Sequence, residues 1–133
     1  MSREDVDQVR AGYEDFYRGD FAALLEKVNP EVVTERVPPL PDPGVYHGHE
    51  GLLKALADWT EDFDDFDMRA EEVTDLGDGR LVVKVFQRAR GRGSGAEVEG
   101  EFWFVHENVG GRLVRLDMFG SREQAFERAR RRE

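Results

Sequence analysis

One segment near the carboxyl end carries charged residues at a spacing suited to acid/base chemistry. Side chains two apart in a β-strand share a face, so the run from 113 to 119 divides into two sets. One set is Leu113, Arg115, Asp117 and Phe119, and the other is Val114, Leu116 and Met118. If the first set faces a pocket, Asp117 is a candidate general base, with Arg115 or Arg88 as its charge partner. If that face meets water, Asp117 is a solvated carboxylate.

His106 is a second candidate for proton transfer. It follows Phe102 and Phe104 at alternating positions, so it shares their face of a predicted strand. A histidine at the mouth of a pocket can carry a proton near neutral pH. The alternative is a strand-end histidine that only hydrogen-bonds. Trp103 falls on the opposite face, where it could serve a dimer interface.

Aromatic residues at helical spacing could line a pocket for a flat apolar molecule, or they could be ordinary core. The predicted substrate-binding residues are Tyr17, Trp59, Phe63, Phe86, Phe102, Phe104 and Phe119, together with Arg88. Arg88 could bind a carboxylate or phenolate through two hydrogen bonds. The alternative for Arg88 is a solvated charge that discourages strand pairing.

The sequence does not support a metal or cofactor site. His47 and His49 flank Gly48, with Glu50 beside them, but the only other histidine is His106. A zinc or iron site needs at least three well-placed ligands. We therefore expect a hydrogen-bonded turn before a helix, and no cofactor.

Composition narrows the classes of function. The formal net charge of −10 opposes binding to phosphate backbones and anionic membrane surfaces, so we expect neither nucleic acid nor membrane as a partner. The absence of cysteine excludes disulfides and agrees with a reducing compartment. No apolar segment approaches the ~20 residues of a membrane span, so a cytoplasmic protein is predicted. A chain of 133 residues fits one domain, residues 1–133.

Hydrophobic periodicity predicts helices first and strands afterwards. A first helix is expected from Ser2 to Gly19, a second from Asp20 to Asn29, and a third from Leu52 through Phe63 and as far as Phe66. The expected strands are 31–37, 68–76, 81–90, 96–107 and 113–119, separated by glycine-rich turns, and a last helix follows Ser121. This order predicts an α+β fold with an antiparallel meander.

Four segments carry a resemblance to a known superfamily. The aromatic helix with its Gly-Asp break at 13–21, the turn at 46–52 and the last hairpin at 110–119 resemble nuclear transport factor 2-like domains. The glycine-rich turn at 87–95 is similar to that of the SnoaL-like, polyketide cyclase-like branch of this superfamily. The resemblance implies a cone: a curved, mixed, mainly antiparallel sheet of about six strands around N-terminal helices, with a short C-terminal helix. It also implies a pocket and a homodimer formed through the sheet.

The catalytic patterns of this superfamily fit only in part. Tyr13 matches the tyrosine of ketosteroid isomerases, but their base position falls at or near Arg36, and Glu35 points to the opposite face of a regular strand. Their second acid falls near Gly100, unless a one-residue shift puts Glu99 or Glu101 there. Steroid isomerisation by that mechanism is therefore not expected.

Polyketide cyclases of the SnoaL type resemble the chain better, and Asp117 is the counterpart of their acid/base carboxylate. The sequence thus predicts an acid/base enzyme of the cyclase or isomerase type, acting on a flat apolar carbonyl compound. Asp117 is the predicted base, Tyr13 and His106 the predicted proton donors, and Arg88 the predicted anion partner. The alternative is a non-catalytic domain that binds a small apolar or aromatic ligand or mediates dimerisation.

Overall fold

A six-stranded mixed sheet organises the chain in the computed structural model, which describes residues 3–131. The strands are β1 (Val28–Arg36), β2 (Gly44–His47), β3 (Phe63–Gly77), β4 (Arg80–Gly91), β5 (Glu97–Val109) and β6 (Arg112–Phe119). They lie in the order β2-β1-β6-β5-β4-β3. Strands β1 and β6 are parallel, and the other neighbours are antiparallel.

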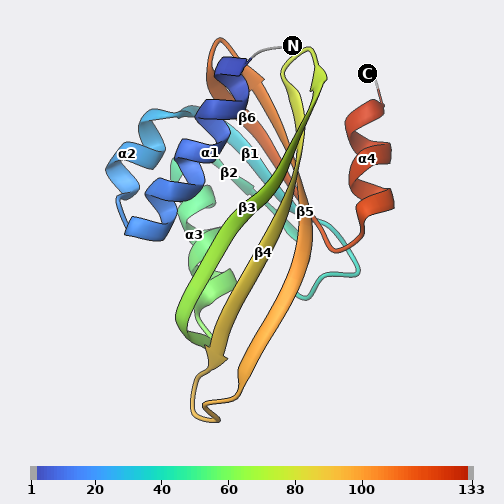
Figure 1. The fold of residues 1–133 in the computed structure, drawn as a ribbon. Helices are drawn as coiled ribbons and strands as arrows, with labels where there is room; N and C mark the ends of the chain where they lie inside the picture. Colours follow the sequence, from blue (N-terminus) through green and yellow to red (C-terminus); the bar gives the residue numbers. More distant parts are fainter. Residues whose placement is uncertain (1–2, 132–133) are drawn as a thin grey trace.

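Helices cover both faces of this curved sheet (Figure 1). Helices α1 (Arg3–Arg18), α2 (Phe21–Glu26) and α3 (Gly48–Thr60) lie against one face, which we call the inner face. Helix α4 (Arg122–Arg130) lies against the other, the outer face. The predicted α+β cone with a short C-terminal helix is therefore confirmed.

Local signals explain where the short helices begin. The Asp20 carboxylate accepts a hydrogen bond from the amide of Ala23 at 3.1 Å, which caps α2. The Ser121 hydroxyl caps α4 by accepting from the amide of Gln124 at 3.3 Å. Both caps stand where the sequence predicts them. Ser2, the predicted start of the first helix, lies outside the described residues.

The third helix is shorter than its aromatic spacing predicts. It ends at Thr60, and both Phe63 and Phe66 belong to strand β3. Phe63 pairs with Gly91 of β4, and the register shifts between Asp64 and Asp67. Phe63 and Phe66 are three residues apart, a spacing that fits one face of a helix. A strand with a bulge between them fits as well, because the extra residue puts both side chains on the same face of the strand.

Two further features of the first half were not predicted. Strand β2 follows the proline-rich loop and pairs antiparallel with β1. Strand β1 begins at Val28, three residues before the predicted start at Glu31, and it contains Pro30. The four residues of β2 are too few to show an alternation, and the proline at position 30 argues against a strand there, so the second helix was predicted to continue to Asn29.

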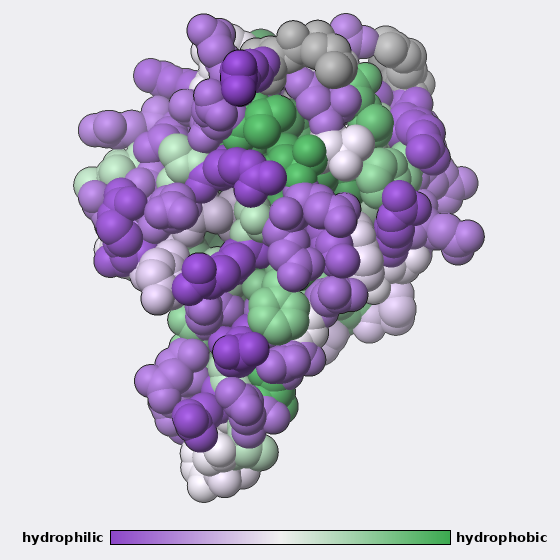
Figure 2. Space-filling model, in the orientation of Figure 1, coloured by the Kyte–Doolittle hydropathy of each residue, from purple (hydrophilic) through white to green (hydrophobic). Residues whose placement is uncertain are grey.

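Two hydrophobic clusters fill the two faces. The inner cluster joins α1 and α3 to alternating residues of the central strands, including Val83, Phe104 and Met118. The outer cluster joins Phe126 of α4 to Phe119 and other strand residues. Beyond the clusters, the far ends of β3, β4 and β5 form a narrow, mostly hydrophilic extension (Figure 2). No helix within residues 3–131 is long and apolar enough to cross a membrane.

The β3–β4 turn fixes the end of β5 that carries His106. The amide of Asn108 donates to the carbonyl oxygen of Gly79 at 2.7 Å. Gly79 has φ 78°, and a Cβ there would collide with the carbonyl oxygen of Asn108. Gly77 has φ 90° but open space around it.

We therefore expect Gly79→Ala to destabilise the fold more than Gly77→Ala. Both variants place alanine in the left-handed region, which costs about 1 kcal/mol. Only Gly79→Ala adds a backbone collision, so its loss of unfolding free energy should exceed about 2 kcal/mol. Urea unfolding followed by tryptophan fluorescence measures both, and equal losses would contradict the collision.

Candidate functional site

A part-buried hydrogen bond joins helix α1 to strand β5 inside the cone. The Tyr13 hydroxyl and Nε2 of His106 lie 2.8 Å apart, and their ring centroids are 5.5 Å apart. Tyr13 belongs to the apolar stripe of α1 that also contains Val9 and Phe16. His106 lies on the inner face because it alternates with Phe104 along β5. Two of the three predicted catalytic residues therefore meet.

Burial keeps both members of this pair neutral at pH 7. His106 is 7% exposed, and burial lowers its pKa from 6.5 to about 3. Burial also raises the pKa of the Tyr13 hydroxyl above its usual value of 10.0. The pair thus contains one neutral phenol and one neutral imidazole, which share one hydrogen bond and carry no charge.

An apolar cavity of about 60 Å³ lies beside this pair, between the helices and the inner face. Its lining comes from α1, α2, α3 and three strands, β3, β5 and β6. The residues are Val9, Gly12, Tyr13, Phe16, Leu24, Leu52, Leu56, Met68, Phe104, Leu113, Leu116 and Met118. Tyr13 is the only polar side chain among them. We call this space the inner cavity.

A groove of about 160 Å³ runs along the outside of Tyr13, between α1 and β3. Tyr13 and Met68 line both this groove and the inner cavity, so they form the wall between the two. Tyr17 lines the groove and is 57% exposed, with the Arg69 guanidinium 5.1 Å from its ring centroid. Tyr17 therefore lies at the surface, outside the inner cavity.

The other predicted aromatic residues of the interior lie toward the far end of α3. Trp59 packs edge-on against Phe102 and Phe104, with centroids 5.1 and 5.8 Å away. Its indole nitrogen donates to the Gln87 side-chain oxygen at 2.7 Å. Phe63 packs against Phe66 at 6.2 Å, farther along β3. Of the predicted pocket phenylalanines, only Phe104 lines the inner cavity.

The structure corrects the facing of Asp117. His106 pairs with Leu116 and Phe104 pairs with Met118, so Asp117 lies on the outer face. The register shifts between Glu107 and Asn108, and this irregularity puts Leu113 on the inner face with Leu116. The sequence grouping of Leu113 with Asp117 was therefore wrong. Asp117 is separated from Tyr13 and His106 by the sheet itself.

On the outer face, Asp117 belongs to an ion-pair network under α4. Arg115 Nε lies 3.0 and 3.1 Å from the two carboxylate oxygens of Asp117, and Arg128 of α4 lies 3.2 Å away. Arg115 also contacts Glu35 at 2.7 Å. These side chains border a polar cavity of about 410 Å³, lined by Glu35, Arg80, Val105, Glu107, Arg115, Asp117, Arg128, Ala129 and Arg131. Since both oxygens of Asp117 are engaged, its clearest effect is to fasten α4 to the sheet.

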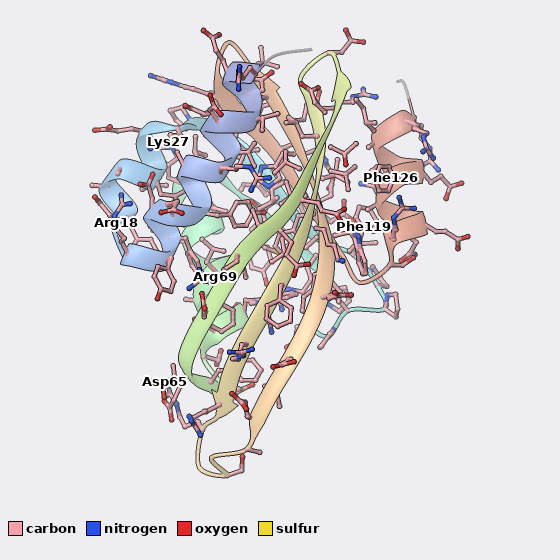
Figure 3. All side chains as sticks on the ribbon, viewed as in Figure 1. Arg18, Lys27, Asp65, Arg69, Phe119 and Phe126 are labelled. Carbon is pink, nitrogen blue, oxygen red and sulfur yellow. The ribbon has the colours of Figure 1, made fainter. Side chains whose placement is uncertain are left out.

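Three further predicted pocket residues also face outward. Phe119 packs beneath α4 in the outer cluster with Phe126, and the two are labelled in Figure 3. Arg88 lies 5.8 Å above the ring of Phe86 and pairs with Glu99 at 3.2 Å on the exposed extension. The alternation of side chains along a strand correctly puts Arg88 on the same face as Phe86. It does not specify whether that face is the one covered by α1 to α3.

The turn before α3 does not bring metal ligands together. His47 is exposed, and His49 bonds the carbonyl oxygen of Val28 at 2.8 Å. Within residues 3–131, no three side chains of His, Asp or Glu are grouped so as to hold a metal ion.

Comparisons with known proteins identify the family. The model of the SnoaL-like domain matches residues 9–116, which is more than half of the chain. The protein belongs to the SnoaL-like family. No curated protein matches the sequence.

Several solved structures share the fold at low sequence identity. A nuclear transport factor 2-like protein of unknown function from Burkholderia pseudomallei is 22% identical, with a TM-score of 0.77 over 98% of this chain and 100% of that chain. TerC, co-crystallised with polyporic acid, is 19% identical, with a TM-score of 0.77 over 95% and 97%. A candidate polyketide cyclase from Xanthomonas campestris pv. campestris is 15% identical, with a TM-score of 0.71 over 92% and 93%.

Two buried polar residues of β1 on the inner face were not predicted from the sequence to belong to the site. Thr34 and Arg36 are 0% and 3% exposed on β1. Arg36 was noted only as the place where a base is missing. Their alternation with Val32 was the available signal, because period 2 puts all three on one face.

The neutral state of His106 makes fold stability depend on pH. The pKa of His106 is 6.5 when unfolded and about 3 when folded, so the unfolded chain binds the extra proton between these values. This stabilisation is present above pH 6.5 and is lost as pH falls toward 3. We expect the unfolding free energy to fall by about 2 kcal/mol from pH 7 to pH 5.

Urea unfolding at pH 7, 6 and 5 tests this dependence before most carboxylates titrate. His106→Gln should flatten the profile. His47→Gln removes an exposed histidine and should leave the profile unchanged. Equal profiles for the parent and His106→Gln would show that His106 is not buried in its neutral form.

Proposed function

We propose that this SnoaL-like protein binds a small, mainly apolar molecule in the inner cavity. The observation that carries the proposal is an apolar space whose one polar lining residue is Tyr13, bonded to the buried His106. Apolar walls with few, well-placed polar groups are typical of small-molecule sites. Tyr13 can hydrogen-bond an oxygen of the ligand while the cavity surrounds its apolar part.

The electrostatics favour binding over acid/base catalysis. An effective general base or acid at neutral pH has a pKa near 7, whereas burial moves the pKa of His106 to about 3 and that of Tyr13 upward. No carboxylate is among the described residues that line the inner cavity. Asp117 lies on the other side of the sheet, with both oxygens bound by arginine. Of the two functions predicted from sequence, the geometry therefore supports the binding domain.

The size of the cavity limits what binds without movement. A cavity of about 150 Å³ in a protein core holds benzene, and the inner cavity is about 60 Å³. A ring-sized ligand must therefore displace part of the wall. Helix α2, which contributes Leu24, contains no fully buried residue. Met68 is unbranched and adaptable, and it separates the inner cavity from the α1–β3 groove, which offers an entrance.

An acid/base enzyme acting on a flat apolar carbonyl compound is the second candidate. It is favoured by the Tyr13 hydroxyl, which can donate a hydrogen bond to a carbonyl oxygen. A relative of the same fold is described as a candidate polyketide cyclase, and another was co-crystallised with polyporic acid. These descriptions support small organic ligands for either candidate.

The homodimer through the sheet also remains a proposal. Helix α4 covers part of the outer face and so reduces the surface available to a second copy of the chain.

Matched ligands test the role of Tyr13. Acetophenone and ethylbenzene have similar shapes, but only acetophenone offers a carbonyl oxygen. We expect acetophenone to bind roughly fivefold more tightly, because one hydrogen bond contributes about 1 kcal/mol. Tyr13→Phe should remove this preference and leave ethylbenzene binding within about twofold. Isothermal titration measures the affinities, and product analysis by chromatography detects any turnover.

A cavity-filling variant tests the location. Gly12 lines the inner cavity, and a Cβ there would meet only Leu24, at 3.6 Å. Gly12→Leu should therefore preserve the fold, because leucine favours helix over glycine, and abolish binding of both ligands. Ala11→Leu is the matched control, since Ala11 does not line the cavity. Unchanged binding to Gly12→Leu would place the ligand elsewhere.

A further inference from the structure

Arg36 is a buried cation without a carboxylate partner among the described residues. It is 3% exposed at the end of β1. Its two terminal nitrogens donate to the carbonyl oxygens of Pro41 and Ala55 at 3.3 and 3.1 Å, and its guanidinium lies 5.0 Å from the centroid of Trp59. Its Nε is buried and has no hydrogen-bond acceptor.

The other buried charges are paired. Asp15 contacts Arg18 at 2.7 Å and Lys27 at 2.6 Å. Asp117 contacts two arginines, as described above. Taking a charge out of water is costly unless an opposite charge compensates it. Arg36 therefore differs from every other buried charge within residues 3–131.

A second unsatisfied polar group lies next to Arg36. Thr34 is 0% exposed, and its hydroxyl has no hydrogen-bond partner. It precedes Arg36 by two residues on the same strand, so both side chains point to the inner face. Buried polar groups normally find partners, and each exception calls for an explanation. Here a hydroxyl and an N–H, both able to donate, occur together on one face.

The strand register puts these two donors beside the inner cavity. Thr34 pairs with Leu116 and Arg36 pairs with Met118, and both β6 partners line the cavity. On the helix side, the carbonyl of Ala55 that accepts from Arg36 lies between Leu52 and Leu56, which also line it. The donors do not themselves line the cavity: they lie on the strand next to two of its lining residues. A ligand therefore reaches them by displacing part of the wall on the β1 side, as the small size of the cavity already requires.

We propose that the ligand of the inner cavity is a small carboxylate whose charged group binds Arg36 Nε and the Thr34 hydroxyl. This inference rests on the proposed function and adds the charge of the ligand to it. The carboxylate supplies the missing counter-charge and accepts from both unpaired donors. The apolar body of the ligand then extends along Leu116 and Met118 toward Tyr13. The net charge of −10 repels anions in general, so a preference for carboxylates must come from a local cation.

Phenylacetate and phenylacetamide test the proposal because they differ mainly in charge. Trp59 contacts Arg36, whereas Trp103 lies on the outer face. A Trp103→Phe background therefore leaves Trp59 as the only tryptophan and a local fluorescent reporter. At pH 7 we expect phenylacetate to bind roughly 10- to 100-fold more tightly than phenylacetamide, as hydrogen bonds to charged groups allow.

Two variants should reduce this preference. Arg36→Met should bring the two affinities within about twofold while phenylacetamide still binds. Thr34→Val keeps the shape and removes the unpaired hydroxyl, so it should weaken phenylacetate several-fold and raise the melting temperature of the ligand-free protein. Arg88→Met, which removes an exposed arginine paired with Glu99, is the matched control and should keep the full preference.

The outcomes separate the two proposals. Equal binding of both compounds in the parent overturns the carboxylate assignment and leaves the apolar site intact. Binding of neither overturns both. If Arg36→Met does not fold, the test uses Thr34→Val and Arg36→Lys, because Arg36→Lys keeps the charge but loses the planar donors. The assignment is contradicted if Thr34→Val binds phenylacetate as tightly as the parent does. It is also contradicted if Thr34→Val and Arg36→Lys both keep the full preference for phenylacetate over phenylacetamide.

Discussion

Coverage of the sheet on both faces is the constraint on which the rest of this structure depends. Helices α1, α2 and α3 pack on the inner face and α4 packs on the outer face, so successive residues of β5 and β6 enter different environments. This alternation brings His106 to Tyr13 and sends Asp117 to the arginines beneath α4. Strand β6 thereby contributes Leu116 and Met118 to the apolar interior and Asp117 to the ion pairs of the outer face. Because the sheet separates them, Asp117 cannot act on a ligand together with Tyr13 and His106.

The treatment of buried polar groups differs between the two faces. On the outer face, charges neutralise one another, as Asp117 does with Arg115 and Arg128. On the inner face, Tyr13 and His106 satisfy each other in neutral form, while Arg36 retains an unpaired N–H. Arg36 Nε and the Thr34 hydroxyl are two unpaired donors on one face of β1, and a ligand that accepts from both contributes most there. The proposed carboxylate site follows from this asymmetry.

Sequence patterns predicted the α+β order well because they depend on features spread over the chain, such as the Asp20 and Ser121 caps and the alternation in β5. The family followed from the resemblance of several segments to a known superfamily. They also grouped His106 with Phe104 correctly. They could not fix which face of β6 is the inner one, because a register irregularity at Glu107 and Asn108 changes the phase. The burial of Arg36 without a counter-charge could not be predicted, because it depends on which distant residues, such as Ala55 and Trp59, the fold brings around it.

The inner cavity itself is the central claim, and a crystal structure determined under xenon pressure tests it most directly. Xenon occupies dry apolar cavities in proteins. The account predicts a xenon atom among Leu52, Leu56, Leu116 and Met118, which line the inner cavity, with Tyr13 still bonded to His106. Side chains filling that space, or xenon bound only outside it, would contradict the account.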